Sequence, residues 1–365
     1  MSLATNEPGV SARLDIDLGA VAANWRQLDA MHPGETAGVV KADAYGLGAV
    51  PVAQALAAAG CGIFFAAHLA EAVALRAALP QARIAVLNGV FGHDAAVFRA
   101  HGLIPVLSTL AEIAQWRAQA RAAGRVLPCF LHLETGMNRL ALPVADCAVL
   151  AADPTLLEGL RVDVVMTHLL AAEVPEDANN ARQLALFSTL LRSFPGVKTS
   201  LANSSGMFLG AAFHTDLARP GAALYGLNPT PGAPNPMRPV VTLRAPILQI
   251  REVGPGESVG YNGVWRAARN SRIATVGVGY ADGYHRSLTN SATACFDDTP
   301  VPLVGRVSMD LSTFDVTDTQ ARPGDWLTLL GPRHDADALA AQAQTNGYEI
   351  LTSLGQRYQR RYFGA

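Results

Sequence analysis

The segment 39–48, which reads VVKADAYGLG, carries the residue types best suited to covalent chemistry. An apolar strand there runs into Lys41, and a loop of small residues and glycines leads on toward a helix. Lys198 is the only other lysine, so arginine supplies 26 of the 28 basic residues. A lysine at a strand end is partly shielded from water, which lowers its pKa, and its neutral amine can form a Schiff base with a carbonyl. The motif also fits a surface lysine, but a guanidinium cannot form an imine, so the retained amine favours chemistry.

The elements that must position Lys41 alternate between short apolar runs and longer Ala- and Leu-rich stretches, from about residue 39 to 225. In one stretch Leu184, Phe187, Leu191 and Phe194 repeat at helical spacing and predict one apolar helix face. Strands that alternate with helices form a parallel sheet, and about eight such units close a (β/α)8 barrel of the TIM type, with active sites at the carboxyl ends of its strands. A doubly wound open sheet is the alternative. The expected strands include 62–67, 83–88, 127–133, 162–167 and 199–202.

The proline-rich stretch 229–239 marks the boundary of a second domain, because it can continue neither a helix nor a central strand. Beyond it the apolar pattern changes to period two, which predicts a β-rich domain. An acidic cap also predicts a helix at 335–344. We therefore expect an α/β barrel at 1–235, whose first residues pair with the second domain, and a β-rich domain at 236–365. The expected strands of that domain are 242–253, 272–278, 301–307 and 326–330.

The composition narrows the class of protein. The 365 residues are 50% hydrophobic and 16% charged, with a net charge of −2, and no apolar run reaches the ~18 residues of a spanning helix. Neither a secretory signal nor a block of basic residues is present, so we expect a cytoplasmic protein that binds neither nucleic acid nor membrane. The four cysteines form no CxxC pair and the nine histidines no HExxH motif, so no metal site is expected.

The segment around Lys41 resembles the pyridoxal-phosphate lysine motif of the alanine racemase family. The resemblance covers nearly the whole chain, and the family fold is an eight-stranded α/β barrel followed by a β-rich domain. It implies that Lys41 holds pyridoxal 5'-phosphate as an internal aldimine. The further matching segments are LETGMNR at 133–139, MTH at 166–168, NSS at 203–205 and RPGAALYGL at 219–227.

The resemblance also implies a set of cofactor contacts. Arg219 matches the arginine that faces the pyridine nitrogen, where a fixed cation disfavours ring protonation and suppresses transamination. His168 matches the histidine that supports the ring and that arginine. The expected phosphate ligands are Tyr45, Ser204, Gly221 and Ala222. Taken singly, each of these residues could equally be a turn residue, an ion-pair partner or a core residue.

Racemisation needs a second base on the opposite face of the substrate. Tyr261, in the segment ESVGYNGVW, matches the family's catalytic tyrosine, which acts on the L-enantiomer while the lysine acts on the D-enantiomer. A phenol with a pKa near ~10 needs neighbouring positive charge or hydrogen bonds to serve as a base at neutral pH. Because Tyr261 lies in the second domain, the resemblance implies a homodimer with active sites at the subunit interface. Arg139, Tyr280 and Met309 match positions that bind substrate.

Two positions depart from the family pattern. His132 stands where many members carry a lysine, carbamylated in some, that orients the arginine corresponding to Arg139. Gln356 stands where members often have a tyrosine that contacts the phosphate. Both departures bear on cofactor affinity and the substrate entrance rather than on the reaction type.

The sequence therefore predicts an alanine racemase that interconverts L- and D-alanine and supplies D-alanine for peptidoglycan. The alternatives are a racemase of broader specificity, a decarboxylase with the same barrel, a non-catalytic pyridoxal-phosphate carrier and a Schiff-base aldolase without cofactor. Tyr261 and Arg219 argue against the decarboxylase, and carriers of that kind lack the second domain.

Overall fold

The structure is a computed structural model that describes residues 12–92 and 94–364. The chain divides into two units. The barrel unit is Gly19–Arg238, and the β-rich unit joins the segment that ends at Leu18 to the segment that begins at Pro239.

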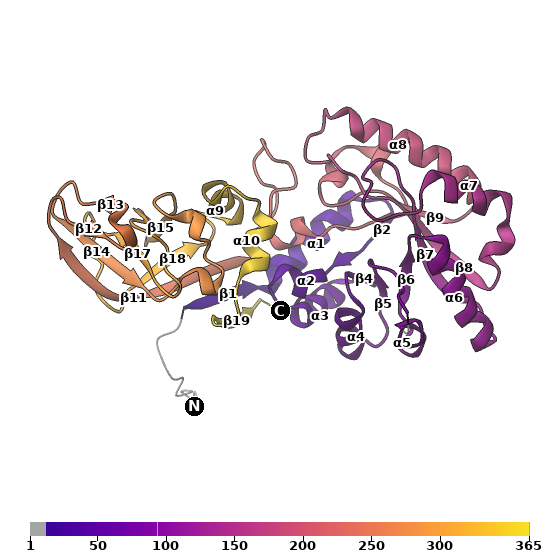
Figure 1. The fold of residues 1–365 in the computed structure, drawn as a ribbon, viewed down its shortest axis with the longest axis horizontal. Helices are drawn as coiled ribbons and strands as arrows, with labels where there is room; N and C mark the ends of the chain where they lie inside the picture. Colours follow the sequence, from indigo (N-terminus) through magenta and orange to yellow (C-terminus); the bar gives the residue numbers. More distant parts are fainter. Residues whose placement is uncertain (1–11, 93, 365) are drawn as a thin grey trace. The chain divides into compact units, whose positions relative to one another are not determined.

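The barrel unit contains seven parallel strands whose order in space follows their order in the chain (Figure 1). Strand β10 (Leu217–Ala218) pairs in parallel with β2 (Glu35–Thr36). Hydrogen bonds from Arg219 N–H to the Ala202 carbonyl (2.9 Å) and from Val39 N–H to the Pro220 carbonyl (3.1 Å) join this pair to both ends of the sheet. The sheet is thus a closed barrel, which confirms the predicted (β/α)8 architecture and rules out the open sheet. The seven strands are β3 (Gly38–Val39), β4 (Ile63–Ala66), β5 (Arg83–Val86), β6 (Ile104–Leu107), β7 (Leu127–His132), β8 (Leu160–Met166) and β9 (Lys198–Ser200).

Helices cover the outside of these strands (Figure 1). Because the strands are enclosed on both sides, β4 and β6 are buried at every position and read as continuous apolar runs. The helices are α1 (Leu18–Met31), α3 (Ala49–Ala59), α4 (Leu69–Ala78), α5 (Asp94–Ala100), α6 (Leu110–Ala123), α7 (Val144–Ala152) and α8 (Ala178–Leu190).

The predicted apolar face of α8 is only partly correct. Phe187 is buried as expected, but the helix ends at Leu190, and Leu191 begins a short 3₁₀ turn. The buried face also includes the polar residues Asn180 and Gln183. Gln183 is buried because it hydrogen-bonds to the ends of strands, as described below.

The β-rich unit is built on a sheet with the order β16-β15-β18-β11-β1-β19, while β14 pairs with β11 and β17. Strand β1 (Arg13–Asp17) runs antiparallel to β11 and parallel to β19, so the start of the described chain belongs to this unit. The helix predicted at 335–344 is α9 (Ala336–Ala343), and the Asp335 side chain accepts the Ala338 N–H (2.9 Å) as its cap. The other elements are β11 (Val241–Val253), β12 (Ser258–Val259), β13 (Trp265–Arg266), β14 (Ser271–Val276), β15 (Thr293–Phe296), β16 (Thr299–Pro302), β17 (Ser312–Asp315), β18 (Trp326–Leu330), α10 (Gly347–Ser353) and β19 (Gln359–Phe363).

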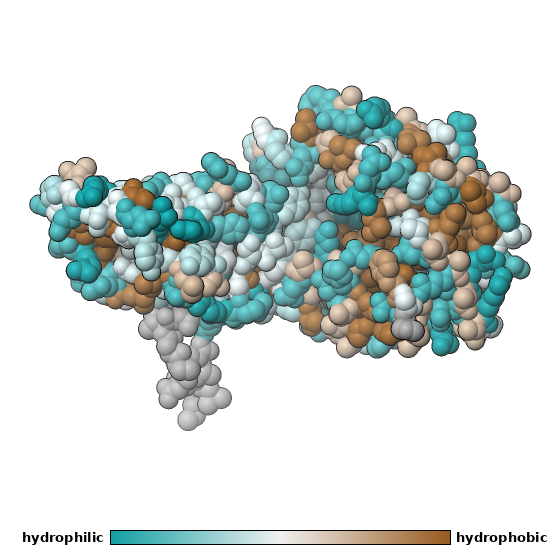
Figure 2. Space-filling view, in the orientation of Figure 1, coloured by the Kyte–Doolittle hydropathy of each residue, from teal (hydrophilic) through white to brown (hydrophobic). Residues whose placement is uncertain are grey.

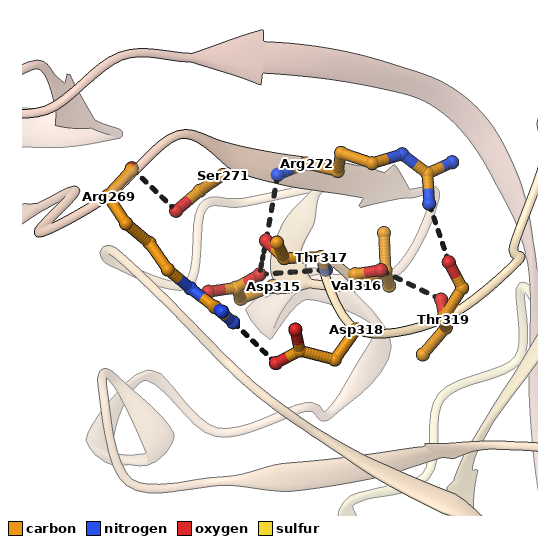
Figure 3. A network of polar contacts seen from close by, with 8 residues as sticks. All are labelled: Arg269, Ser271, Arg272, Asp315, Val316, Thr317, Asp318 and Thr319. Atoms are coloured by element: carbon orange, nitrogen blue, oxygen red, sulfur yellow. Dashed lines mark hydrogen bonds and ion pairs between the residues drawn. The ribbon is translucent and has the colours of Figure 1, made fainter.

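Polar contacts join the start of β14 to the turn that follows β17 (Figure 3). The Arg272 N–H donates to Thr317 Oγ1 (2.9 Å), and its guanidinium donates to the Thr319 carbonyl (2.8 Å). Arg269 forms an ion pair with Asp318 beside them. The turn therefore has a fixed place against the sheet.

The surface has a mixed polar and apolar character. Figure 2 shows brown apolar patches among teal polar residues on the barrel unit, and more teal and pale residues on the β-rich unit. All four cysteines are buried and free. Among the described residues, no helix combines the length and the apolar character that crossing a membrane requires.

Candidate active site

Lys41 follows β3 and begins a tight turn with an unusual backbone. The four residues 42–45 all have positive φ, between 51° and 55°, a conformation that costs non-glycine residues about 1–2 kcal/mol each. Hydrogen bonds within the segment close the turn, from Ala44 N–H to the Val40 carbonyl (2.9 Å) and from Gly46 N–H to the Ala42 carbonyl (2.7 Å). Such strain persists where the surrounding structure holds it, and it is common at functional sites.

The amine of Lys41 has an altered proton affinity. Burial lowers its pKa, the positive charge of Arg139 lowers it further, and the negative charge of Glu71 opposes both effects. A lowered pKa increases the neutral fraction of the amine, which is the form that attacks a carbonyl.

The second lysine lies in a different setting. Lys198 is the first residue of β9, more than half of its side chain is exposed, and its Nζ lies 3.5 Å from Glu35 Oε2. Because the strands are parallel, Lys198 lies at the amino end of the barrel and Lys41 at the carboxyl end. Only Lys41 therefore has the position and the environment of a reactive amine.

The residues predicted to hold the phosphate meet beside the Lys41 turn. A Cβ on Gly221 would lie 2.4 Å from the Tyr45 hydroxyl oxygen, so that hydroxyl lies against the glycine backbone. Ser204 Oγ accepts hydrogen bonds from Gly221 N–H (3.0 Å) and Ala223 N–H (3.1 Å). These two bonds leave the Ser204 hydroxyl hydrogen to point elsewhere, and together with the Tyr45 hydroxyl and the Ala222 N–H it makes a set of donors suited to a phosphate. We call Tyr45, Ser204, Gly221 and Ala222 the phosphate cradle.

Sequence reasoning assigned no role to Tyr225, but this residue contacts both the cradle and the strand that precedes Lys41. Its hydroxyl donates to the Val39 carbonyl (2.8 Å), just before Lys41, and its ring centroid lies 4.7 Å from that of Tyr45. Burial raises the pKa of Tyr45 to about 12, so its hydroxyl keeps its proton and can donate it in a hydrogen bond. The only sequence signal for Tyr225 was its place in the segment 219–227.

Arg219 is buried at the end of β10. Its guanidinium donates to Ser200 Oγ and to the Thr167 carbonyl, which fixes its direction. Burial lowers the pKa of Arg219 to about 9, so the group still carries its positive charge at neutral pH. Burial and the charge of Arg219 together hold the pKa of His168 well below its usual range, so His168 is neutral.

Gln183 from α8 ties these strand ends together. Its Nε2 donates to Thr135 Oγ1 (3.0 Å) and to the His168 carbonyl (2.9 Å), while its Oε1 accepts the Leu170 N–H (2.9 Å). Thr135 Oγ1 in turn lies 2.7 Å from Thr167 Oγ1. Sequence reasoning missed Gln183, whose only signal is an amide on the buried face of α8, which also carries Asn180.

Arg139 lies on an exposed loop after β7 that Glu134 shapes. The Glu134 carboxylate accepts the N–H groups of Gly136 and Asn138, the latter at 2.9 Å. No ion-pair partner of Arg139 occurs within residues 12–92 and 94–364, so its charge is available to an anion. His132 lies at the end of β7, where burial and the charge of Arg219 lower its pKa to about 4 and keep it neutral.

The structure brings Tyr261, Tyr280 and Met309 to neighbouring loops of the β-rich unit. Tyr280 N–H donates to the Ser308 carbonyl (3.0 Å), and Ala281 N–H donates to the Met309 carbonyl (2.9 Å). A Cβ on Gly260, next to Tyr261, would lie 3.3 Å from the Arg306 nitrogen. The three residues are 68%, 43% and 53% exposed, so the rest of the β-rich unit leaves their phenolic and apolar side chains uncovered.

A cavity of about 520 Å³ also lies in the β-rich unit, lined in part by Asp15, Arg244, Arg333 and Arg361. Its arginines have carboxylate partners, because Arg244 and Arg361 share Asp15, the latter at 3.9 Å, and Arg333 pairs with Asp298 (2.8 Å). The cavity contains no lysine, and no metal-binding group of three or more His, Cys, Asp or Glu occurs in the described part of the chain. We therefore place the candidate active site at the barrel mouth.

A closed α/β barrel with a shielded lysine and a phosphate cradle at its carboxyl end, followed by a β-rich unit, defines a class of cofactor-dependent barrel proteins. The alanine racemase N-terminal domain family matches residues 16–229, and the alanine racemase C-terminal domain family matches residues 240–362. The chain belongs to the alanine racemase family.

Individual relatives resemble the chain over nearly its whole length. The alanine racemase of Acidiphilium cryptum is 61% identical over 348 residues, which are 95% of this chain and 97% of the relative. That of Methylobacterium sp. is 50% identical over 355 residues, 96% and 97% of the two chains. The crystal structure of alanine racemase from Bartonella henselae with covalently bound pyridoxal phosphate is 39% identical, with a TM-score of 0.93 over 97% of this chain and 100% of that one.

Proposed function

We propose that this protein is a pyridoxal-phosphate-dependent racemase that interconverts L-alanine and D-alanine. The observation that carries the proposal is the placement of Lys41, an amine of lowered pKa, beside the phosphate cradle on the family's barrel. The proposal extends to cytoplasmic location and to the supply of D-alanine for peptidoglycan.

The residues present fit pyridoxal phosphate. The Tyr45 hydroxyl lies against the Gly221 backbone, and the Ser204 hydroxyl lies 3.0 Å from the Gly221 N–H, so two hydroxyls converge on one glycine, as a phosphate site requires. Arg219 presents a fixed, buried cation where the resemblance places the pyridine nitrogen, and Lys41 supplies the amine for a covalent link. Pyridoxal phosphate, when bound, withdraws electrons from the Cα–H bond of an amino acid and makes that proton removable.

Different residues of the chain serve the two proton transfers and the binding of cofactor and substrate. Lys41 Nζ takes or returns the Cα proton on one face, for the D-enantiomer, and Tyr261 Oη does so on the other, for the L-enantiomer. His168 and Arg219 would hold the pyridine ring of the cofactor and disfavour its protonation, which suppresses transamination, while Arg139 would pair with the substrate carboxylate. Tyr280 and Met309 border the substrate.

The open surface around Tyr261 supports a homodimer. Tyr261 is 68% exposed, whereas a phenol that acts as a base at neutral pH needs shielding from water and neighbouring positive charge or hydrogen bonds. We propose that residues 236–365 of one copy present this surface to the barrel, residues 1–235, of a second copy. The partner subunit would then complete the site with its tyrosine.

Circular dichroism of an L-alanine solution tests the function. On addition of purified protein and pyridoxal phosphate, the optical signal should decay to zero while the total alanine concentration stays constant. A signal that persists on alanine but decays on other amino acids would instead show a racemase of different specificity. Loss of alanine itself would show decarboxylation or transamination.

A further inference from the structure

Glu71 has no role in the proposed proton transfers, but its carboxylate accepts three hydrogen bonds from backbone N–H groups. It is the third residue of α4, in the unit that follows Lys41 around the barrel. Its Oε1 accepts the N–H of Ala42 (2.7 Å), and its Oε2 accepts the N–H groups of Ala67 (2.8 Å) and His68 (3.0 Å). One carboxylate therefore joins the residue directly after Lys41 to the end of β4 and the start of α4.

These contacts bear on the strained turn. Some hydrogen bonds close the turn from within, such as Gly48 N–H to the Asp43 carbonyl (2.8 Å) and Ala49 N–H to Asp43 Oδ1 (2.7 Å). Val40 N–H also donates to the Phe65 carbonyl (2.9 Å), so the backbone just before Lys41 is held by β4. The bond from Ala42 to Glu71 joins the turn to a neighbouring strand and helix, and hydrogen bonds to an ionised acceptor are stronger than neutral ones.

We propose that Glu71 is a positioning residue that holds the Lys41 turn in place at the barrel mouth, so that the lysine amine meets a carbonyl seated on the phosphate cradle. The inference rests on the proposed function, which supplies that carbonyl. Glutamine cannot replace Glu71, because its amide has one acceptor oxygen and a donor NH₂ group that would face either Ala42 N–H or the N–H pair at 67 and 68.

The charge of Glu71 and its positioning role have opposite effects on the reactivity of the Lys41 amine. Its negative charge favours the protonated form of Lys41, so a substitution that removes the charge enlarges the neutral, reactive fraction of the amine. If charge were the only role of Glu71, E71Q would react with aldehydes faster than wild type. If position matters more, E71Q reacts more slowly.

Glu112 provides a matched control. It occupies the same place in α6, where its carboxylate accepts the N–H groups of Ser108 (2.8 Å) and Val90 (3.1 Å). It joins two βα loops in the same way, but no lysine lies in either loop. E112Q therefore reports the general cost of removing such a carboxylate from this barrel.

The experiment compares cofactor-free wild type, E71Q and E112Q by two readouts. Stopped-flow absorbance follows condensation with pyridoxal phosphate, and amide hydrogen exchange follows a peptide that spans residues 42–48. We expect E71Q to condense at least about tenfold more slowly and its peptide to exchange at least about tenfold faster, with E112Q close to wild type in both.

Condensation of E71Q at or above the wild-type rate would overturn the inference, as would equal slowing in E112Q or unchanged exchange in the peptide. If wild type does not condense with pyridoxal phosphate at all, the proposed function fails. The exchange readout still decides in that case whether Glu71 holds the turn.

Discussion

The hydroxyl of Tyr45 lies so close to the backbone of Gly221 that a methyl group at position 221 would approach it to 2.4 Å. The two residues come from opposite ends of the barrel sequence, one after β3 and the other after β10. Their contact occurs because the barrel closes between β10 and β2. Closure of the barrel thus assembles the phosphate cradle.

Gly221→Ala should weaken cofactor binding. Gly221 has a negative φ of −127°, and the Cβ of an alanine there would displace the Tyr45 ring. We expect the dissociation constant for pyridoxal phosphate, measured by absorbance titration, to rise by at least about tenfold. Gly62→Ala is the control, because a Cβ there meets nothing within 4 Å. Equal binding by both variants would remove Gly221 from the cradle.

Tyr261→Phe should separate cofactor binding from racemisation. The barrel contacts remain, so the cofactor spectrum should stay as in wild type, while conversion of alanine falls by about 10²–10⁴-fold, the usual contribution of an acid–base group. In D₂O, D-alanine should still exchange its Cα proton with retention, because Lys41 serves that enantiomer.

Proton NMR for exchange and chiral chromatography for conversion measure these two outcomes. Racemisation at the wild-type rate in both directions would exclude Tyr261 as a base. Loss of cofactor binding in the same variant would show that Tyr261 supports the structure rather than acting as a base.

Because the pKa of His132 is lowered in the folded state, this residue should make the protein less stable in acid. Its pKa is about 4 in the folded protein and near 6.5 when unfolded, so between these values the unfolded chain binds a proton that the native chain does not. The free energy of unfolding therefore falls as the pH drops from 6.5 to 4, by about 3 kcal/mol from this group. Denaturant unfolding of wild type and His132→Asn across this range should differ by that amount, and parallel curves would contradict the assignment.

Arg357 should affect substrate binding through the loops that carry Tyr280 and Met309. It donates to Asp282 (2.6 Å) and Asp310 (2.7 Å), one residue in each loop. Arg357→Gln should raise the KM for alanine by about tenfold and leave cofactor binding unchanged, because misplaced positioning groups cost rate and affinity. Arg269→Gln removes an exposed ion pair elsewhere in the same unit (Figure 3) and should change neither. A KM that stays at the wild-type value in Arg357→Gln would show that the two loops do not need this clamp.

The fold could be predicted where a residue pattern depends on local periodicity. The run 326–330 is β18 as expected, and the acidic cap at Asp335 does open a helix. The strand predicted at 301–307 is wrong beyond Pro302, because β16 ends there and Leu303 makes only an isolated bridge to Phe314. Strand β6, which contains Pro105, and the two-residue β10 were not foreseen, since only the closed sheet stabilises such short or interrupted strands.

The site was predictable where a residue belongs to a motif and hidden where it acts through contacts made by folding. Lys41 stands out because the chain has so few lysines, and the cradle followed from a family resemblance. Glu71 and Gln183 make their contacts with backbone groups 29 and 15 residues away, which no local pattern records. A carboxylate in the first turn of a helix is so common a cap that its second contact carries no signal in the sequence.

Locating the residue that binds pyridoxal phosphate covalently tests the role of Lys41 most directly. Purified protein loaded with pyridoxal phosphate is reduced with borohydride, digested and analysed by mass spectrometry. We expect a pyridoxyl group on Lys41 and none on Lys198, with loss of alanine racemisation in proportion to the modification. Modification of Lys198 or of the terminal amine with activity lost, or full racemisation without modification of Lys41, would contradict this expectation.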